Sequence, residues 1–226
     1  MTEARRAVAI ARILDREWAS SAAPIKLLPR RDPFTVLVGA VLSTRTQDAV
    51  TAAAVRRLMA SAPSSARLSR MGLTRLRRLI YPVGFYRTKA RQLHLLARQV
   101  AHLRYVPNTL EGLLELPGVG RKVANVVLAE AFGKPAVAVD THVHRISNRL
   151  GLVQTTRSEQ TEAVLIRLIP KRLRGRWNRL IVSLGQTYCR PVRPRCRECP
   201  VGSLCLKVGV DLREYQSCQS SARTTR

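Results

Sequence analysis

The chain has 226 residues, 40 of them Lys or Arg and only 14 Asp or Glu, so its formal charge is +26. A hydrophobic fraction of 46% allows a buried core and excludes a disordered polycation, while an aromatic fraction of 4% disfavours a stacking platform for single strands. No apolar run reaches the roughly 18 residues of a membrane span. Asp15 and Glu17 disfavour both a signal peptide and an Arg-rich transit peptide. We therefore expect a cytoplasmic protein, nucleoid-associated if prokaryotic, with a polyanionic partner and no membrane partner.

Helical periodicity dominates the chain and strand patterns are scarce, which predicts an all-α fold of roughly ten helices. Pro33 fits the first turn of a helix that Asp32 caps, and Asp140 is placed to cap another. In chain order, we predict helices at 4–19, 34–42, 50–60, 73–80, 88–103, 110–114, 121–132, 141–150, 159–169 and 175–184, with a loop at 62–65, an irregular tail after Tyr188 and disorder at 217–226.

The few acidic residues are unevenly distributed along the chain. Residues 51–110 contain no Asp or Glu but twelve Lys or Arg. Genomic base composition could explain why 34 basic residues are Arg and only 6 are Lys, but it does not explain the loss of acids. Such a field favours the phosphate backbone of nucleic acid. An anionic membrane surface is the weaker alternative, because the arginines do not line one amphipathic helix.

Four of the five cysteines form one cluster with the pattern C-x6-C-x2-C-x5-C. Disulfides are disfavoured in a reducing compartment, so metal ligation is favoured. Zinc sites usually pair two C-x2-C knuckles, and the single knuckle here favours a [4Fe-4S] cluster, although spacing alone leaves both possible. Cys218 lies out of spacing and is expected to be a free thiol. The expected ligands are Cys189, Cys196, Cys199 and Cys205.

Three arginines lie between the first two cysteines, on a loop that two prolines stiffen. If a metal orders this loop, the loop presents a basic surface able to bind phosphates. The simpler alternative is a purely structural metal site whose arginines have no role in binding. The expected DNA contacts of this loop are Arg190, Arg193 and Arg195.

A glycine-rich turn lies between two predicted helices at residues 116–122, LPGVGRK. Two glycines in three residues permit a tight turn with positive φ and close approach of another molecule. The N-terminus of the following helix then forms a site suited to one phosphate, although the turn could also be an ordinary core connection. The expected DNA contacts are Pro117, Gly118, Val119, Gly120 and Arg121.

Lys122 is a candidate nucleophile at the start of that helix. An arginine could bind phosphate in its place but could not supply a neutral amine. The helix dipole and Arg121 both disfavour the ammonium form, which is the direction that Schiff-base chemistry needs. A lone surface lysine is the commoner situation.

Asp140 follows the apolar run 136–139 and is a candidate general base. Beyond capping a helix, a partly buried carboxylate there could accept a proton and stabilise a developing cation. Capping and catalysis are compatible.

These residues resemble the endonuclease III family of DNA glycosylases. The stretch 116–152 is similar to that family's helix-hairpin-helix, Gly/Pro-rich loop and catalytic aspartate. The four-cysteine spacing is similar to its [4Fe-4S] loop. Residues 42–48 and 84–90 also look like family segments, so the resemblance extends from about Pro33 to Cys205.

The resemblance implies two helical domains flanking a DNA-binding cleft. A six-helix barrel with the helix-hairpin-helix would span 24–134, and residues 1–23 with 135–226 would form the iron–sulfur domain. It also implies that a damaged base is flipped from the duplex. Lys122 would attack the sugar C1′ with activation by Asp140, and the Schiff base would permit β-elimination.

Two positions depart from the family pattern. Arg45 stands where many members have a glutamine that fills the gap left by the flipped base. Phe85 stands at a wedge position that leucine often occupies, and an aromatic ring there could stack into the duplex. Both departures bear on lesion preference rather than on the reaction class.

The leading hypothesis is a monomeric bifunctional glycosylase and abasic-site lyase that acts on oxidised pyrimidines in duplex DNA. A second hypothesis keeps the fold but makes the protein mainly an abasic-site lyase or a mismatch glycosylase. A third is a non-enzymatic DNA-binding module, which intact Lys122 and Asp140 disfavour because binding alone needs neither.

Overall fold

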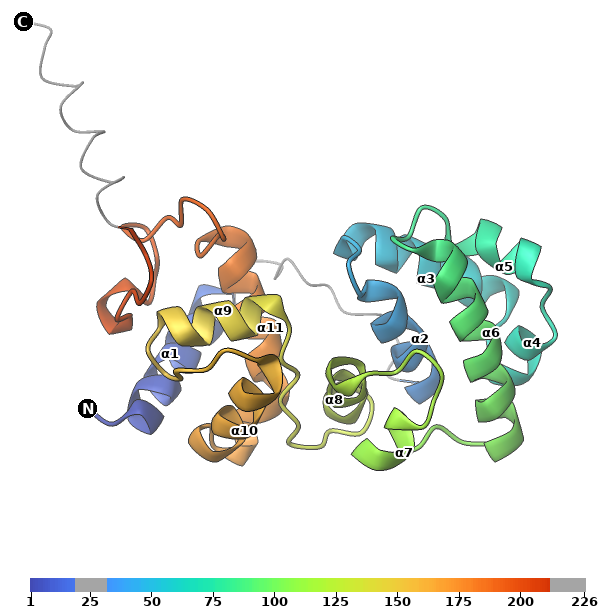
Figure 1. Cartoon of the computed structure of the whole chain (residues 1–226), viewed down its shortest axis with the longest axis horizontal. Coiled ribbons are helices and arrows are strands. Elements are labelled where there is room, and N and C mark those ends of the chain that lie inside the picture. Colours follow the sequence, from blue (N-terminus) through green and yellow to red (C-terminus); the bar gives the residue numbers. More distant parts are fainter. Residues whose placement is uncertain (19–31, 212–226) are drawn as a thin grey trace, which may run out of the picture. The chain divides into compact units, whose positions relative to one another are not determined.

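The computed structural model describes residues 1–18 and 32–211, and within these ranges the chain contains eleven α-helices, one 3-10 helix and no strand (Figure 1). The prediction of an all-α fold is therefore confirmed for the described residues. Cys218 and the predicted disordered tail lie outside them. The helices are α1 (Glu3–Glu17), α2 (Pro33–Ser43), α3 (Asp48–Ser61), α4 (Ser65–Ser69), α5 (Leu73–Ile80), α6 (Tyr86–Leu103), α7 (Leu110–Leu114), α8 (Arg121–Glu130), α9 (Thr141–Arg149), α10 (Ser158–Leu168), α11 (Lys171–Thr187) and η1 (Gly202–Leu204).

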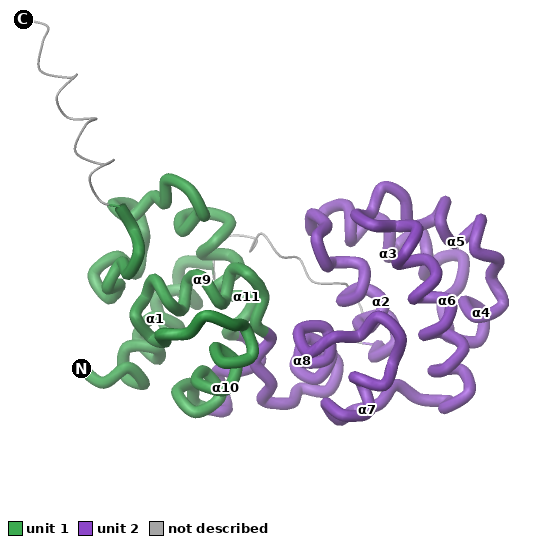
Figure 2. Tube along the Cα trace, viewed as in Figure 1, with its two compact units in different colours: residues 1–24, 139–170, 177–226 green, residues 25–138, 171–176 purple. Residues whose placement is uncertain are grey.

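The chain folds as two compact units (Figure 2). Unit 2 comprises the described residues of 25–138 together with 171–176. Unit 1 comprises the described residues of 1–24, 139–170 and 177–226. The long helix α11 thus contributes its first residues to one unit and the rest to the other.

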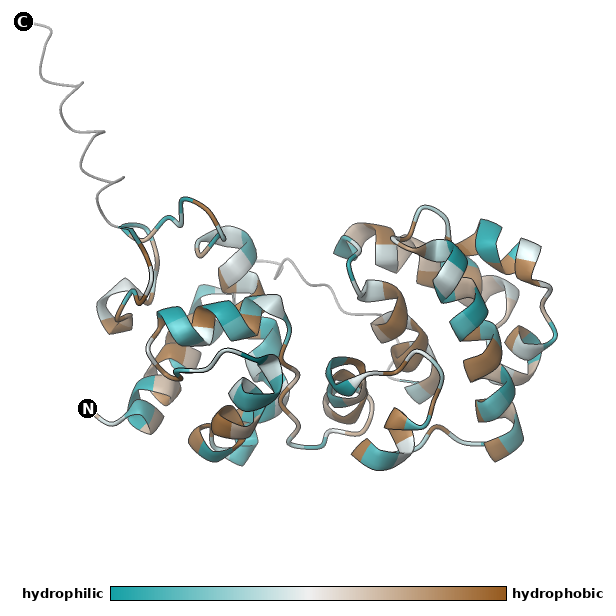
Figure 3. Ribbon diagram, in the orientation of Figure 1, coloured by the Kyte–Doolittle hydropathy of each residue, from teal (hydrophilic) through white to brown (hydrophobic). Residues whose placement is uncertain are grey.

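Helix α2 lies at the centre of unit 2. All nine residues from Phe34 to Leu42 are buried, and α2 contacts α3, α6 and α8. The ribbon of α2 is coloured mostly as hydrophobic (Figure 3). A helix that is apolar on every side is stable only when other helices cover it, which is the arrangement found here. At eleven residues α2 is short, and none of the described helices combines the length and the apolarity needed to cross a membrane.

Unit 1 has its own core, built by α1, α9, α10 and the second part of α11. The Trp177 side chain is fully buried, and apolar side chains from each helix are buried as well. These helices hold the aspartate and the cysteine loop described below. The core residues include Ile10, Leu14, Val143, Ile146, Leu165 and Ile181.

Both predicted aspartate caps are confirmed. The Asp32 carboxylate accepts a hydrogen bond from the Thr35 N–H at 2.9 Å, with Pro33 in the first turn of α2. The Asp140 carboxylate accepts from the Val143 N–H at 2.9 Å at the start of α9. Each bond satisfies one of the N–H groups that the first turn of a helix leaves without an intrahelical partner.

Some predicted boundaries were wrong. Ser65, expected in a loop, begins α4, because the Ser64 hydroxyl accepts from the Arg67 N–H and Leu68 is buried. The helix expected at 175–184 runs from Lys171 to Thr187, since Pro170 precedes it and Gly175 does not interrupt it. In both cases packing extends helical structure beyond the apolar pattern visible in sequence.

Candidate functional site

The glycine-rich turn joins α7 to α8 in unit 2. Gly118 has φ +77°, and a Cβ on it would lie 2.9 Å from Cδ and 3.0 Å from Cβ of Gln92. The Val119 N–H donates to the Leu116 carbonyl at 3.1 Å, which closes the turn. Both the backbone conformation and the neighbouring side chain therefore require glycine at position 118.

The start of α8 is suited to an anion. Gly120 is the N-cap, has no side chain to cap the helix and is exposed, and a Cβ there would meet nothing within 4 Å. Arg121 is also exposed, whereas the Val119 side chain is 7% exposed and packs in the core of unit 2. Any phosphate contact by Val119 would thus use its backbone, at the positive end of the α8 dipole.

Lys122 projects from the first turn of α8 toward the end of α2. Its side chain is half-buried, and its Nζ lies 3.5 Å from the Oγ of Ser43, the last residue of α2. The amine is therefore held against the protein at a helix N-terminus rather than extended into solvent.

A second lysine, which the sequence reasoning did not single out, reaches the same segment from α6. Lys89 is 4% exposed, and its Nζ donates to the Leu42 carbonyl at 2.9 Å, the Thr44 carbonyl at 2.5 Å and the Thr46 Oγ1 at 3.1 Å. Burial, and then the positive charge of Lys122, lower the pKa of Lys89 from 10.5 to about 8. Two features of the sequence could have drawn attention to Lys89: it lies in the family-like segment 84–90, and it is one of only six lysines.

The structure brings Arg45 and Phe85 together on two neighbouring loops of unit 2. The guanidinium carbon of Arg45 lies 5.6 Å from the centre of the Phe85 ring, a cation–π distance. The loops approach closely at Gly84, whose N–H donates to the Thr46 Oγ1 at 3.2 Å and whose added Cβ would lie 2.4 Å from the Arg45 carbonyl oxygen. The two residues that depart from the family pattern therefore contact each other.

Asp140 lies in unit 1, directly before α9, and is partly exposed. The bond that Oδ1 accepts from Val143 fixes the orientation of the carboxylate. The neighbouring guanidinium of Arg145 donates to the Cys189 carbonyl at 2.9 Å, which connects α9 to the start of the cysteine loop.

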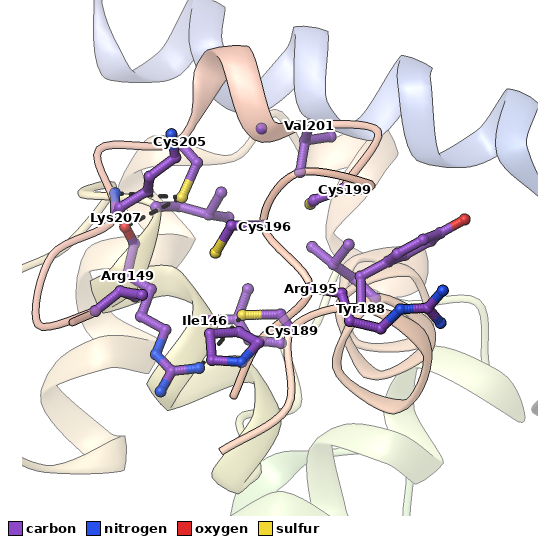
Figure 4. A pocket seen from close by; sticks show the side chains of 15 residues that line it. Ile146, Arg149, Tyr188, Cys189, Arg195, Cys196, Cys199, Val201, Cys205 and Lys207 are labelled. Carbon is purple, nitrogen blue, oxygen red and sulfur yellow. Dashed lines mark hydrogen bonds between the residues drawn. The ribbon is translucent and has the colours of Figure 1, made fainter. Parts of the chain in front are cut away.

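All four clustered cysteines line one cavity of unit 1, and their sulfur atoms face a common space (Figure 4). The cavity holds about 400 Å³ of empty space, including its open mouth. Each of these four cysteines is partly exposed, and none of them forms a disulfide. The apolar side chains around the cavity include Ile146, Leu150, Leu184, Val201 and Val210.

Backbone and side-chain N–H groups surround the sulfur atoms. Among the described residues, no three or more His, Cys, Asp or Glu side chains are gathered closely enough to hold a metal ion. The Lys207 N–H donates to the Cys205 Sγ at 3.3 Å, and an Arg149 N–H donates to the Cys189 Sγ at 3.6 Å. Burial raises the pKa of the Cys199 thiol to about 11, opposed by a backbone hydrogen bond from Val201. Four soft donors around one space match iron–sulfur ligation.

The three arginines of the cysteine loop differ in their contacts: only Arg195 is shown paired with other side chains of the loop. Arg190 and Arg193 are exposed, and Arg149 holds the loop by donating to the Arg190 carbonyl at 2.6 Å. Arg195 is paired within the loop, since its Nε donates to the Glu198 Oε1 at 3.0 Å and its guanidinium lies over the Tyr188 ring. A DNA contact by Arg195 would have to compete with this exposed ion pair.

Comparison with known proteins places these features in a family. Residues 38–171 match the model described as "HhH-GPD superfamily base excision DNA repair protein". The chain is 44% identical to endonuclease III of Thermotoga maritima over 188 residues, covering 80% of this chain and 88% of that protein. It is 40% identical to the chloroplastic endonuclease III homolog 1 of Arabidopsis thaliana, covering 79% of this chain but only 50% of the plant protein.

A solved structure extends the similarity to the fold. It is described as "Structure of a Trapped Endonuclease III-DNA Covalent Intermediate: Estranged-Adenine Complex". It matches with a TM-score of 0.81 and 31% identity, covering 92% of this chain and 97% of that one.

Proposed function

The chain belongs to the endonuclease III family within the HhH-GPD superfamily of base excision DNA repair proteins, and from that premise we propose that Lys122 and Asp140 carry its chemistry. At the level of the family, the chain is a DNA glycosylase and abasic-site lyase of base excision repair. The observation that carries the assignment of residues is Lys122, a half-buried amine in the first turn of α8 directly after the glycine-rich turn.

In the proposed reaction, the neutral Lys122 amine attacks C1′ of the damaged nucleotide. The C1′–N bond to the base breaks, and the base leaves with the bonding electrons and takes up a proton. Ring opening of the sugar yields a Schiff base between Nζ and C1′. Loss of a C2′ proton then expels the 3′ phosphate oxygen, which nicks the strand. The positive end of the α8 dipole disfavours the ammonium form of Lys122 and so supports its role as nucleophile.

We assign the proton transfers to Asp140. A carboxylate can accept the proton that the attacking amine loses and can offset the positive charge that develops on the sugar. Its hydrogen bond from the Val143 N–H supports this role, because it fixes the carboxylate without neutralising it.

DNA binding by the family fits the charge of this chain. Solved complexes of endonuclease III with DNA match the fold. We propose that phosphates bind at the start of α8 and along the cysteine loop, through residues 117–121 and Arg190, Arg193 and Arg195. Arg45 and Phe85 would occupy the space from which the base is flipped. We further propose that the protein acts as a cytoplasmic monomer. Unit 2 would correspond to the barrel domain expected at 24–134 and unit 1 to the cluster domain expected at 1–23 and 135–226, except that, among the described residues, 135–138 and 171–176 belong to unit 2.

We propose that the four cysteines hold a [4Fe-4S] cluster. When bound, the cluster supplies iron–thiolate bonds that cross-link the loop from Cys189 to Cys205. The cavity ringed by the four thiols and the N–H groups directed at Cys189, Cys199 and Cys205 support this assignment. The cluster's contribution to DNA binding would be to keep the basic loop ordered.

The proposed substrate is duplex DNA that contains an oxidised pyrimidine. A panel of duplexes carrying an oxidised pyrimidine, a mismatched thymine, an abasic site or no lesion tests this assignment by measuring base release and strand nicking separately. We expect base release from the oxidised duplex and nicking of both the oxidised and the abasic duplexes. Nicking of the abasic duplex alone would instead favour a dedicated lyase, and release from the mismatch alone would favour a mismatch glycosylase.

A further inference from the structure

Two lysine side chains from different helices end on the same short segment of unit 2. Lys89, from α6, binds the Leu42 and Thr44 carbonyls, and Lys122, from α8, lies beside Ser43 between them in sequence. The proposed function uses only Lys122. A buried lysine that takes part in no proposed step needs its own explanation, because burying an ammonium group is costly unless it is well hydrogen-bonded.

The segment is the C-terminal end of α2, which is electrically negative. The last carbonyls of a helix have no intrahelical donor, and the helix dipole adds about half a negative charge there. Lys89 supplies the donor for two of these carbonyls and a full positive charge beside them. Without Lys89, the same carbonyls would favour the ammonium form of the other lysine at this end of the helix.

The two ammonium groups also repel each other. The charge of Lys122 contributes to the lowered pKa of Lys89, and because a Coulomb interaction is mutual, a protonated Lys89 disfavours the protonated form of Lys122. Helix α2 carries no charged side chain, and α6 carries no acid. The other charged or titratable groups on α6 and α8 are Arg87, Arg91, His94, Arg98, His102, Arg121 and Glu130. The loop after α2 adds Arg45, and α3, which packs on α2, carries Asp48, Arg56 and Arg57.

We propose that Lys89 is a positioning residue for the reaction of Lys122: its buried ammonium occupies the carbonyl end of α2 and thereby keeps Lys122 available as a neutral amine. This inference rests on the proposed function of Lys122. With a pKa of about 8, Lys89 is predominantly protonated near neutral pH. Its bond to Thr46 Oγ1 also ties the Arg45 loop to α6.

The first test measures how the single-turnover rate of borohydride trapping on abasic duplex depends on pH. For Lys89→Met, the pH midpoint should rise by about one unit, so that trapping near neutral pH falls roughly tenfold while the rate at high pH is retained. Lys89→Arg keeps the charge and should keep the midpoint close to that of the unaltered protein. Lys134→Met removes a lysine that also donates to a backbone carbonyl, that of Asn108, and should leave the midpoint unchanged.

A purely structural role for Lys89 gives a different result. Lys89→Met would then lower the rate by the same factor at every pH and leave the midpoint in place, and this outcome would overturn the proposal. An equal shift with Lys134→Met would also overturn it, because a general loss of positive charge would then be sufficient.

A second test needs no change at the buried position. Carbon-13 NMR of the six lysine Cε groups can follow the titration of Lys89 in the unaltered protein and in Lys122→Gln. We expect the Lys89 midpoint to rise from near 8 when Lys122 loses its charge. An unchanged midpoint would contradict the proposal even if Lys89→Met failed to fold. This readout needs no DNA, so it also separates failure of the proposal from failure of the proposed function.

Discussion

Arg45 lies over the ring of Phe85, with its guanidinium carbon 5.6 Å from the ring centre, and both residues have a left-handed backbone, with φ of 49° and 56°. Such conformations are uncommon for residues other than glycine and mark locally constrained loops. Gly84 and Lys89 supply the constraint, through their bonds to the Arg45 loop. Two exposed side chains are thus held together before any DNA is bound.

We predict that Phe85 and Arg45 contribute to binding in different ways. Phe85→Ala should weaken binding to an abasic duplex by about tenfold without changing its salt dependence, because the ring would insert between bases. Arg45→Ala should weaken binding and also reduce the slope of log affinity against log salt by about one, because it removes one positive charge from the surface that contacts DNA. Fluorescence anisotropy over a salt series measures both. Tyr105→Ala removes another exposed aromatic ring of unit 2 and should change neither quantity, and an equal loss with this control would contradict the assignment.

Gly118→Ala should lower the free energy of unfolding by more than the cost of placing an alanine at positive φ. A left-handed alanine costs on the order of 1 kcal/mol, and here its Cβ would also press against the Gln92 side chain at 2.9 Å. Gly133→Ala is the matched control, since Gly133 has φ +62° but open space at its Cβ. Urea unfolding should therefore show a larger loss for Gly118→Ala. Equal losses would mean that Gln92 moves away without cost.

Asp140→Asn should separate capping from catalysis. Asparagine caps helices about as well as aspartate, so the free energy of unfolding should change by less than about 0.5 kcal/mol. Base release should nevertheless fall by about a hundredfold or more, because an amide can neither accept the proton nor offset positive charge. Asp140→Ala should in addition lose about 1 kcal/mol of stability with the cap. If Asp140→Asn kept full activity, capping would be the only role of this residue.

The cysteine loop should require iron. The purified protein should absorb at about 400 nm and contain iron, and Cys199→Ala should lose both. The matched control is Cys218→Ala, because that cysteine lies outside the spacing pattern, and it should retain the colour. Stoichiometric zinc without iron, measured by elemental analysis, would contradict the assignment.

Local patterns in the sequence predicted the positions of helices and caps well, because those depend on neighbouring residues. The predicted ranges 73–80 and 110–114 coincide with α5 and α7, and the Asp140 cap depends on a residue only three positions away. The buried contacts of Lys89 could not be predicted, because one of them is a hydrogen bond to the Leu42 carbonyl, 47 positions earlier. Periodicity shows which face of a helix is buried but not which distant backbone group that face meets.

The cysteine site was predictable in part, because the spacing of its four cysteines is a local pattern. The spacing of the four cysteines indicated that they act together, and Figure 4 shows their sulfur atoms around one space. Other lining residues, such as Ile146 on α9 and Leu184 on α11, come from helices that no local pattern connects to the cysteine loop. The contact between Arg45 and Phe85 could not be predicted from local patterns either, because the two residues belong to different family-like segments, 42–48 and 84–90.

Borohydride trapping tests most directly whether the Lys122 amine forms the covalent bond to DNA. The folded protein is mixed with a duplex containing an abasic site, reduced and digested, and the modified peptide is identified by mass spectrometry. We predict an adduct at Lys122 in the unaltered protein and in Lys134→Gln, and no adduct in folded Lys122→Gln. An undiminished adduct in Lys122→Gln, or modification of another residue in the unaltered protein, would contradict the account.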